Sequence, residues 1–181
     1  MKVNRWKVDR IASAVGFSVP HMMVSTVTGT FEEFSGELQG NIADLTKSKI
    51  SFQVIVPSIQ TKNRDRDLHL CSEDFFDAQI FPQMTFTSRS IYNDIDGKYQ
   101  MSGDLTVKNT TKRAVFCITP KEVTIFGATY LVEGEIKRKD FGLMWNRAIE
   151  AGGVMVGDVI DIRMTIVVSK DEENIKQQQP E

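Results

Sequence analysis

The sequence is poor in the residues that most often carry metal or thiol chemistry. It has two cysteines and two histidines in 181 residues. Cys71 and Cys117 belong to no CxxC pair, so we expect two buried, reduced thiols rather than a disulfide. A protein zinc site needs three or four converging ligands. His21 and His69 lack the HxH or HxxxH spacing that would supply them, and we expect no metal site.

Net charge and long apolar runs are also scarce. The chain has 22 Lys and Arg against 24 Asp and Glu, a formal net charge of −2. This balance gives no electrostatic basis for binding nucleic acid or an anionic membrane. No apolar run near the start is typical of a signal peptide, and none reaches transmembrane length. We therefore expect a cytoplasmic protein with no stable membrane insertion and no nucleic-acid partner.

Signatures of phosphate binding and of nucleophilic catalysis are missing. The glycines at 152, 153 and 157 follow neither the GxGxxG nor the GxxxxGK[ST] pattern. His69 beside Asp65 or Asp67 could form a general base oriented by a carboxylate. No serine or cysteine nucleophile with a recognisable context accompanies it. We expect Asp67 and His69 to brace the loop before Ser72, with no catalytic residue and no cofactor.

The sequence is rich in two-residue alternation of apolar and polar side chains. No segment shows a convincing 3.6-residue period, and βαβ spacing is absent, which predicts an antiparallel all-β fold. A sandwich and a closed barrel both fit. Long strands with internal glycines favour an extended, eight-stranded, up-and-down, lipocalin-like barrel, since closure requires tilted and coiled strands. The extended regions are residues 6–20, 22–38, 50–61, 84–92, 99–107, 114–118, 123–137 and 158–169.

One short helix and a polar tail interrupt this pattern. Ser72 is a good helix N-cap, and Glu73 and Asp74 follow where the helix dipole favours negative charge. Pro82 excludes a long helix, so we predict a short helix that starts at Ser72. We also predict a single barrel domain over residues 1–169 and a disordered tail over residues 170–181.

Aromatic and methionine side chains recur on the strand faces and predict the barrel interior. An eight-stranded barrel is either filled by its own side chains or holds one slender ligand, and periodicity does not distinguish the two. Trp145 fits either the mouth or a plug at the closed end, since an indole favours a site with one apolar and one wet side. The candidate ligand-binding residues are Phe17, Val19, Phe31, Phe34, Phe52, Val54, Phe75, Phe76, Met84, Phe86, Met101, Phe116, Phe126, Phe141 and Trp145.

Several short motifs occur in one order from Trp6 to about Val168. In this order they resemble the YceI-like family of lipocalin-like polyisoprenoid-binding proteins, although Ala12 stands where many members have histidine. The motifs include Trp6-Lys-Val-Asp9, Gly29-Thr-Phe31, Ser58-Ile-Gln-Thr61, Arg66-Asp67, His69-Leu70, Asp74-Phe-Phe-Asp77, Phe86-Thr-Ser88, Gly103-Asp-Leu-Thr106, Arg138, Asp140-Phe-Gly-Leu143 and Gly157-Asp158.

The resemblance implies an elongated apolar bore that holds a polyisoprenoid or an isoprenoid quinone. It also implies a homodimer and no shared catalytic constellation. The expected function is to carry or sequester such a lipid. Two alternatives stay open: an enzyme that acts on an isoprenoid lipid through Asp67 and His69, and a filled barrel that acts through its surface as a stress or assembly protein.

Overall fold

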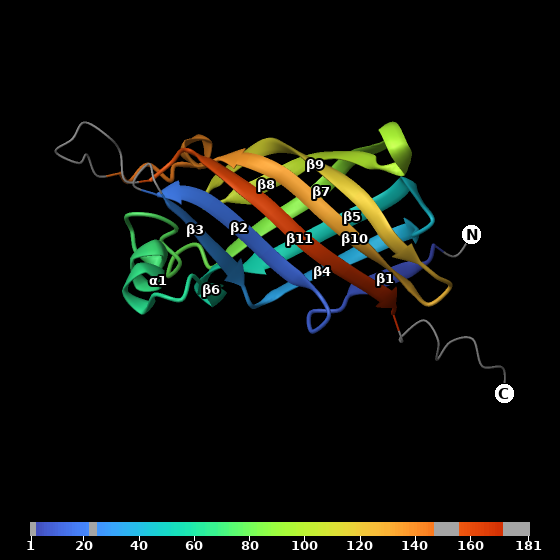
Figure 1. Ribbon diagram of the computed structural model, residues 1–181, viewed down its shortest axis with the longest axis horizontal. Coiled ribbons are helices and arrows are strands. Elements are labelled where there is room, and N and C mark those ends of the chain that lie inside the picture. Colours follow the sequence, from blue (N-terminus) through green and yellow to red (C-terminus); the bar gives the residue numbers. More distant parts are fainter. Residues whose placement is uncertain (1–2, 22–24, 147–155, 172–181) are drawn as a thin grey trace.

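Alternating strands pair with their sequence neighbours and close into an antiparallel barrel (Figure 1). The structure is a computed structural model that describes residues 3–21, 25–146 and 156–171. The strands are β1 (Arg5–Val8), β2 (Ala14–His21), β3 (Ser25–Phe31), β4 (Phe34–Asn41), β5 (Asp44–Ile55), β6 (Ile59–Gln60), β7 (Gln83–Asn93), β8 (Tyr99–Val107), β9 (Thr110–Val123), β10 (Gly127–Lys137) and β11 (Val159–Lys170). The helices are α1 (Arg64–Cys71) and the 3-10 turns η1 (Val56–Ser58), η2 (Ile95–Gly97) and η3 (Arg138–Phe141).

The eleven strands combine into eight longer ones. β1 and β2 pair with different stretches of β11, β1 near its C-terminal end and β2 nearer its start. β4 pairs with β1, and β3 pairs with β2. On the next long strand, β5 pairs with β4, and β6 pairs with β3. Each of these long strands pairs with its neighbour in sequence, and β11 closes the ring against β1 and β2. The predicted eight-stranded up-and-down barrel is confirmed.

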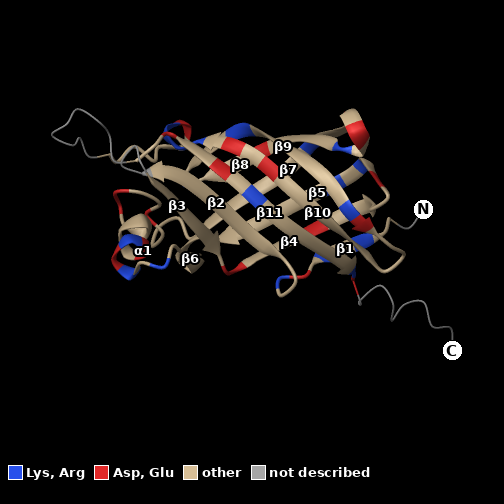
Figure 2. Cartoon of the chain, viewed as in Figure 1, with Lys and Arg blue, Asp and Glu red and all other residues tan. Residues whose placement is uncertain are grey.

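Side chains alternate between the barrel interior and its outer surface. β8 is a clear example, because Tyr99, Met101, Gly103, Leu105 and Val107 are buried while the residues that alternate with them are partly exposed. Charged residues of both signs are spread along the strands and in the turns (Figure 2). A shift of one residue in register would turn the whole apolar face outward, so this alternation fixes the register.

The β4–β5 turn closes one end of the barrel, which we call the blind end. Ile42 in this turn is buried, and Leu45 at the start of β5 is only 1% exposed. The Tyr130 hydroxyl on β10 donates to the carbonyl of Ile42 at 2.6 Å, and the Tyr99 hydroxyl on β8 donates to the carbonyl of Ala43 at 3.4 Å. Burial raises the pKa of Tyr130 above its usual range, which keeps this hydroxyl protonated as a donor. The backbone of the turn is thereby tied to strands that rise from other parts of the wall.

Helix α1 lies at the opposite end, and its position corrects the predicted one. It begins after Asn63, whose side chain accepts from the amide of Arg66 at 3.0 Å, and acidic residues occupy its first turn. Ser72 ends the helix, because its hydroxyl donates to the carbonyl of His69 at 2.6 Å. The segments that begin at Asn63 and at Ser72 both carry the polar cap and early acidic residues of a helix start. The segment that begins at Asn63 forms the helix. Residues 72–80 form turns instead.

The two tyrosine hydroxyls should contribute unequally to stability. Replacing Tyr130 with Phe removes the short bond and leaves the buried Ile42 carbonyl without this donor, at an expected cost of about 1–3 kcal/mol. Tyr99→Phe is the matched control, and its longer bond of 3.4 Å should make it cost less. Urea unfolding of the two variants measures the difference. Equal losses would contradict the larger contribution expected of the Tyr130 bond.

Candidate functional site

A cavity of about 240 Å³ runs along the inside of the barrel. Near the blind end it is lined by Leu45 and Tyr130, and near α1 by Phe75 and Phe76. Every strand contributes at least one lining residue. An apolar cavity of roughly 150 Å³ is enough to stay dry and bind a benzene ring. The barrel is therefore hollow, with room for a longer apolar group.

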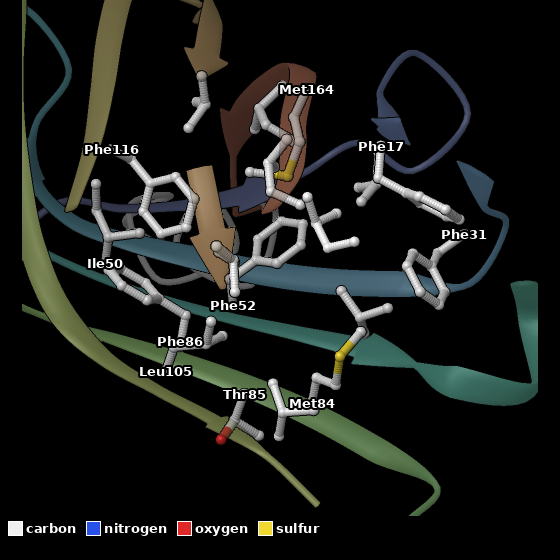
Figure 3. Close-up of a pocket in the computed structure, with 18 of the residues that line it drawn as sticks. Phe17, Phe31, Ile50, Phe52, Met84, Thr85, Phe86, Leu105, Phe116 and Met164 are labelled. Atoms are coloured by element: carbon white, nitrogen blue, oxygen red, sulfur yellow. The ribbon is translucent and has the colours of Figure 1, made fainter. Parts of the chain in front are cut away.

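Most of the residues predicted from the alternation line this cavity, although their contact with a ligand stays a prediction. They are Phe17, Val19, Phe31, Phe52, Val54, Phe75, Phe76, Met84, Phe86, Met101, Phe116 and Phe141. Figure 3 shows the rings of Phe17 and Phe31 on one side of the cavity and those of Phe86 and Phe116 on the other.

The rest of the lining is mainly aliphatic, and the candidate set, which favours aromatics and methionines, omits these aliphatic residues together with Tyr130 and Met164. The alternation along β11 could have supplied five of these residues. The omitted residues include Val8, Val15, Leu38, Leu45, Ile50, Ile59, Leu70, Leu105, Val107, Ile118, Tyr130, Val132, Ile136, Leu143, Val156, Ile160, Ile162, Met164, Ile166 and Val168.

Three predicted residues lie outside the cavity lining. Phe34 is buried and stacks on Phe52 with a centroid distance of 5.8 Å. Phe126 is 76% exposed, so the expectation that its ring faces the bore is wrong. The reason is a turn between β9 and β10, closed by the Thr124 amide on the Gly127 carbonyl, which interrupts the alternation. Trp145 lies at the α1 end, against His69 and Phe75.

Glycines that face the bore leave space for aromatic rings of the neighbouring strands. A Cβ atom at any of these positions would come within 3.0 Å of a ring carbon on a neighbouring strand. The glycine and ring pairs are Gly29 with Phe17, Gly36 with Phe52, Gly103 with Phe86, and Gly134 with Phe116.

Each ring therefore takes the space that the glycine side chain would have occupied. A ring that lies over a glycine covers the wall instead of reaching across the bore. With ordinary side chains at these positions, the rings would have to project further inward, because the interior of an eight-stranded barrel is only just wide enough for side chains to fill. The glycine and ring pairs leave an open path along the barrel.

Arg138 is the one buried cation in the described lining, and its guanidinium is fully used. It donates from Nε to the Gly157 carbonyl at 2.8 Å, and from Nη1 to the carbonyls of Leu143 at 2.6 Å and Trp145 at 2.8 Å. Nη2 donates to the Val156 carbonyl at 3.2 Å and lies 3.5 Å from the Asp158 carboxylate. Burial lowers the pKa of Arg138, but arginine remains protonated in proteins. Arg138 therefore holds two backbone segments together and offers no free donor to a ligand.

His69 sits in a ring cluster at the α1 end. Its Nε2 lies 2.8 Å from the Asp74 carboxylate, and its ring packs edge-on against Trp145 and Phe75. Asp67 instead accepts from the Thr61 amide at 3.0 Å and from the Thr61 hydroxyl. Asp67 and His69 thus have separate partners, and both brace the α1 segment. Within the described ranges, no group of three or more His, Cys, Asp or Glu side chains could hold a metal ion.

The family model for the YceI-like domain matches residues 6–168. The chain belongs to the YceI-like family. A UPF0312 protein of Staphylococcus epidermidis is 35% identical over 179 residues, covering 93% of this chain and 99% of that protein. A UPF0312 protein of Staphylococcus aureus is 35% identical over 163 residues, covering 86% and 91%. The family resemblance inferred from the sequence motifs is confirmed.

Solved structures of YceI-like barrels superpose on this one. The Campylobacter jejuni YCEI protein matches with a TM-score of 0.72 at 27% identity, covering 84% of this chain and 90% of that one. BcnA of Burkholderia cenocepacia matches with a TM-score of 0.79 at 24% identity, covering 88% and 98%. A polyisoprenoid binding domain from Saccharophagus degradans matches with a TM-score of 0.68 at 13% identity, covering 92% and 98%. The last two likenesses establish the fold alone.

The pairing of rings and glycines should appear as energetic coupling. Gly36→Ala would press a Cβ against the Phe52 ring and the Val8 side chain, and we expect a loss of about 1–3 kcal/mol from overpacking. Phe52→Leu replaces that ring with a smaller aliphatic side chain, so in the double variant the cost of Gly36→Ala should fall below its cost alone. Ser35→Ala, one residue away on the exposed face, is the control and should change little. Unfolding free energies that add without coupling would contradict this account of the bore.

Proposed function

We propose that this YceI-like protein binds one long apolar lipid, a polyisoprenoid or an isoprenoid quinone, inside its barrel and carries or sequesters it. The observation that carries the proposal is the continuous apolar cavity. Moving an apolar chain from water into such a cavity yields about 0.8 kcal/mol for each buried CH₂ group. Shape and apolar contact therefore suffice for tight binding, and no charged contact is needed.

The polar atoms near the cavity support an apolar cargo. The Tyr130 hydroxyl donates its hydrogen bond to the Ile42 carbonyl, and the Arg138 guanidinium donates to backbone carbonyls. A polar head group inside the bore would lack partners, and its burial would be unfavourable. The name of the Saccharophagus degradans domain states that a polyisoprenoid is bound by a protein with this fold.

We further propose that the lipid enters at the α1 end. The blind end is held by the tyrosine hydroxyls that donate to the carbonyls of its turn, whereas α1 has no buried residue. An element with few buried contacts opens at low cost in free energy. On this proposal Trp145 lies beside the mouth, where its indole would be close to the lipid head group.

The proposed setting is a cytoplasmic homodimer without a nucleic-acid partner. The net charge of −2 supports the absence of nucleic acid, and the family resemblance supports the dimer. Light scattering coupled to size exclusion tests the oligomeric state. In the part of the chain that the structure describes, no helix has the length and apolar character needed to cross a bilayer.

Extraction of the purified protein with organic solvent should release a prenyl lipid at near-stoichiometric amount. Mass spectrometry identifies the lipid and quantifies it against the protein. Protein unfolded and refolded without lipid is the control, and it should take up added isoprenoid quinone to the same ratio. Protein that purifies free of lipid and takes up none after refolding would favour the alternative of a barrel acting through its surface.

His69→Gln tests whether the protein is a lipid carrier or an enzyme that acts on the lipid through His69. The variant should stay folded and lipid-loaded, with at most about 1 kcal/mol of stability lost, because the Asp74 carboxylate is more than half exposed and water replaces the contact. Asp74→Ala is the matched control, since it removes the same contact from the other side and should behave alike. Turnover of a prenyl lipid by the wild type that His69→Gln abolishes would refute the carrier proposal.

A further inference from the structure

We infer that the blind end of the cavity is a chain-length stop: its apolar floor, formed by Leu45, Leu38 and Tyr130, meets the tail of the bound lipid and limits the length of chain that fits. This inference rests on the proposed function, because it concerns the same cavity. It adds the direction in which the lipid lies and the residues that select among lipids of one class.

The floor is built to stay in place. Leu45 lines the cavity and is 1% exposed, directly after the turn that crosses the end of the barrel. β8 holds this turn through Tyr99 and β10 holds it through Tyr130. The Trp6 indole on β1 holds the adjoining end of β4, where it donates to the carbonyl of Gly40 at 3.4 Å. A longer lipid could pass the floor only by breaking these bonds together.

The chemistry of the floor selects the tail over the head group. Leu38, Leu45, Ile118 and Val168 line this end and carry no polar side-chain atom. The hydroxyl hydrogen of Tyr130 is already used on the Ile42 carbonyl. A buried carbonyl or phosphate placed here would lose its water without gaining a donor, which is unfavourable. The lipid therefore lies with its tail at Leu45 and its head group toward α1.

The length available is finite and comparable to a short prenyl chain. On β11 the lining runs from Ile160 to Val168. Eight residue steps at roughly 3.3 Å each give roughly 26 Å along the strand, and a strand tilt of about 35–45° reduces this to roughly 20 Å along the axis. A chain that exceeds this space keeps its last apolar groups in water and gains nothing from them. Affinity should rise with chain length and then level off or fall.

Substitutions at Leu45 should move that limit. In competition binding with polyprenols of graded chain length, Leu45→Ala should shift the best-bound polyprenol to a longer one, by about one isoprene unit. Leu45→Phe should shift it to a shorter one, so the two variants give opposite results. Leu143→Ala is the matched control, because Leu143 is also buried and lines the cavity but lies at the α1 end. It should leave the best-bound length unchanged. If Leu45→Ala fails to fold, Leu45→Val and Leu45→Phe carry the test.

The outcomes separate the stop from the function itself. The same best-bound length for the wild type and the Leu45 variants, with polyprenol bound by all of them, would overturn the chain-length stop and leave lipid binding intact. An equal shift with Leu143→Ala would also overturn it, because the limit would then not lie at the blind end. Failure of every protein, the wild type included, to bind any polyprenol would overturn the proposed function together with this inference.

Discussion

The hollow interior depends on the close approach of aromatic rings to inward-facing glycines. A closed eight-stranded barrel has little room inside, and ordinary side chains would fill it. Phe17, Phe52, Phe86 and Phe116 each lie over a glycine of a neighbouring strand, in space where a Cβ atom would clash. The glycines weaken the strands in isolation, and the rings compensate by covering the exposed backbone. The same contact therefore stabilises the wall and keeps the centre of the barrel open.

The polar groups around the cavity are already paired with other groups of the protein. Tyr130 and Tyr99 fix the β4–β5 turn across one end, and Arg138 gathers the segments that follow β10 and precede β11 at the other. An unpaired buried polar group would be costly, and the described side chains contain none. A fully paired polar framework around an apolar bore suits a cargo that is long, uncharged and variable in detail.

The two ends of the barrel differ in what holds them. The blind end is tied through backbone carbonyls, and its side chains are among the most buried in the protein. The α1 end is covered by a short helix without buried residues and by the ring cluster of His69, Phe75 and Trp145. His69 and Asp67 serve there as braces with separate partners. This asymmetry gives the bore a direction, and the proposals on entry and chain length both follow from it.

The sequence by itself determined the strand pattern, because alternation with a period of two is local and survives without tertiary information. This alternation predicted the eight extended regions, the closed barrel and most of the aromatic lining. The sequence placed the helix at Ser72 because two adjacent segments both satisfy the rules for a helix start. The segment after Asn63 forms the helix, and the hydrogen bonds from Thr61 to Asp67 hold it against the preceding strand. The alternation placed Phe126 inside because a turn within a long apolar run is hard to see. Only the tertiary structure decided that the barrel is hollow, since that depends on which ring lies over which glycine across neighbouring strands.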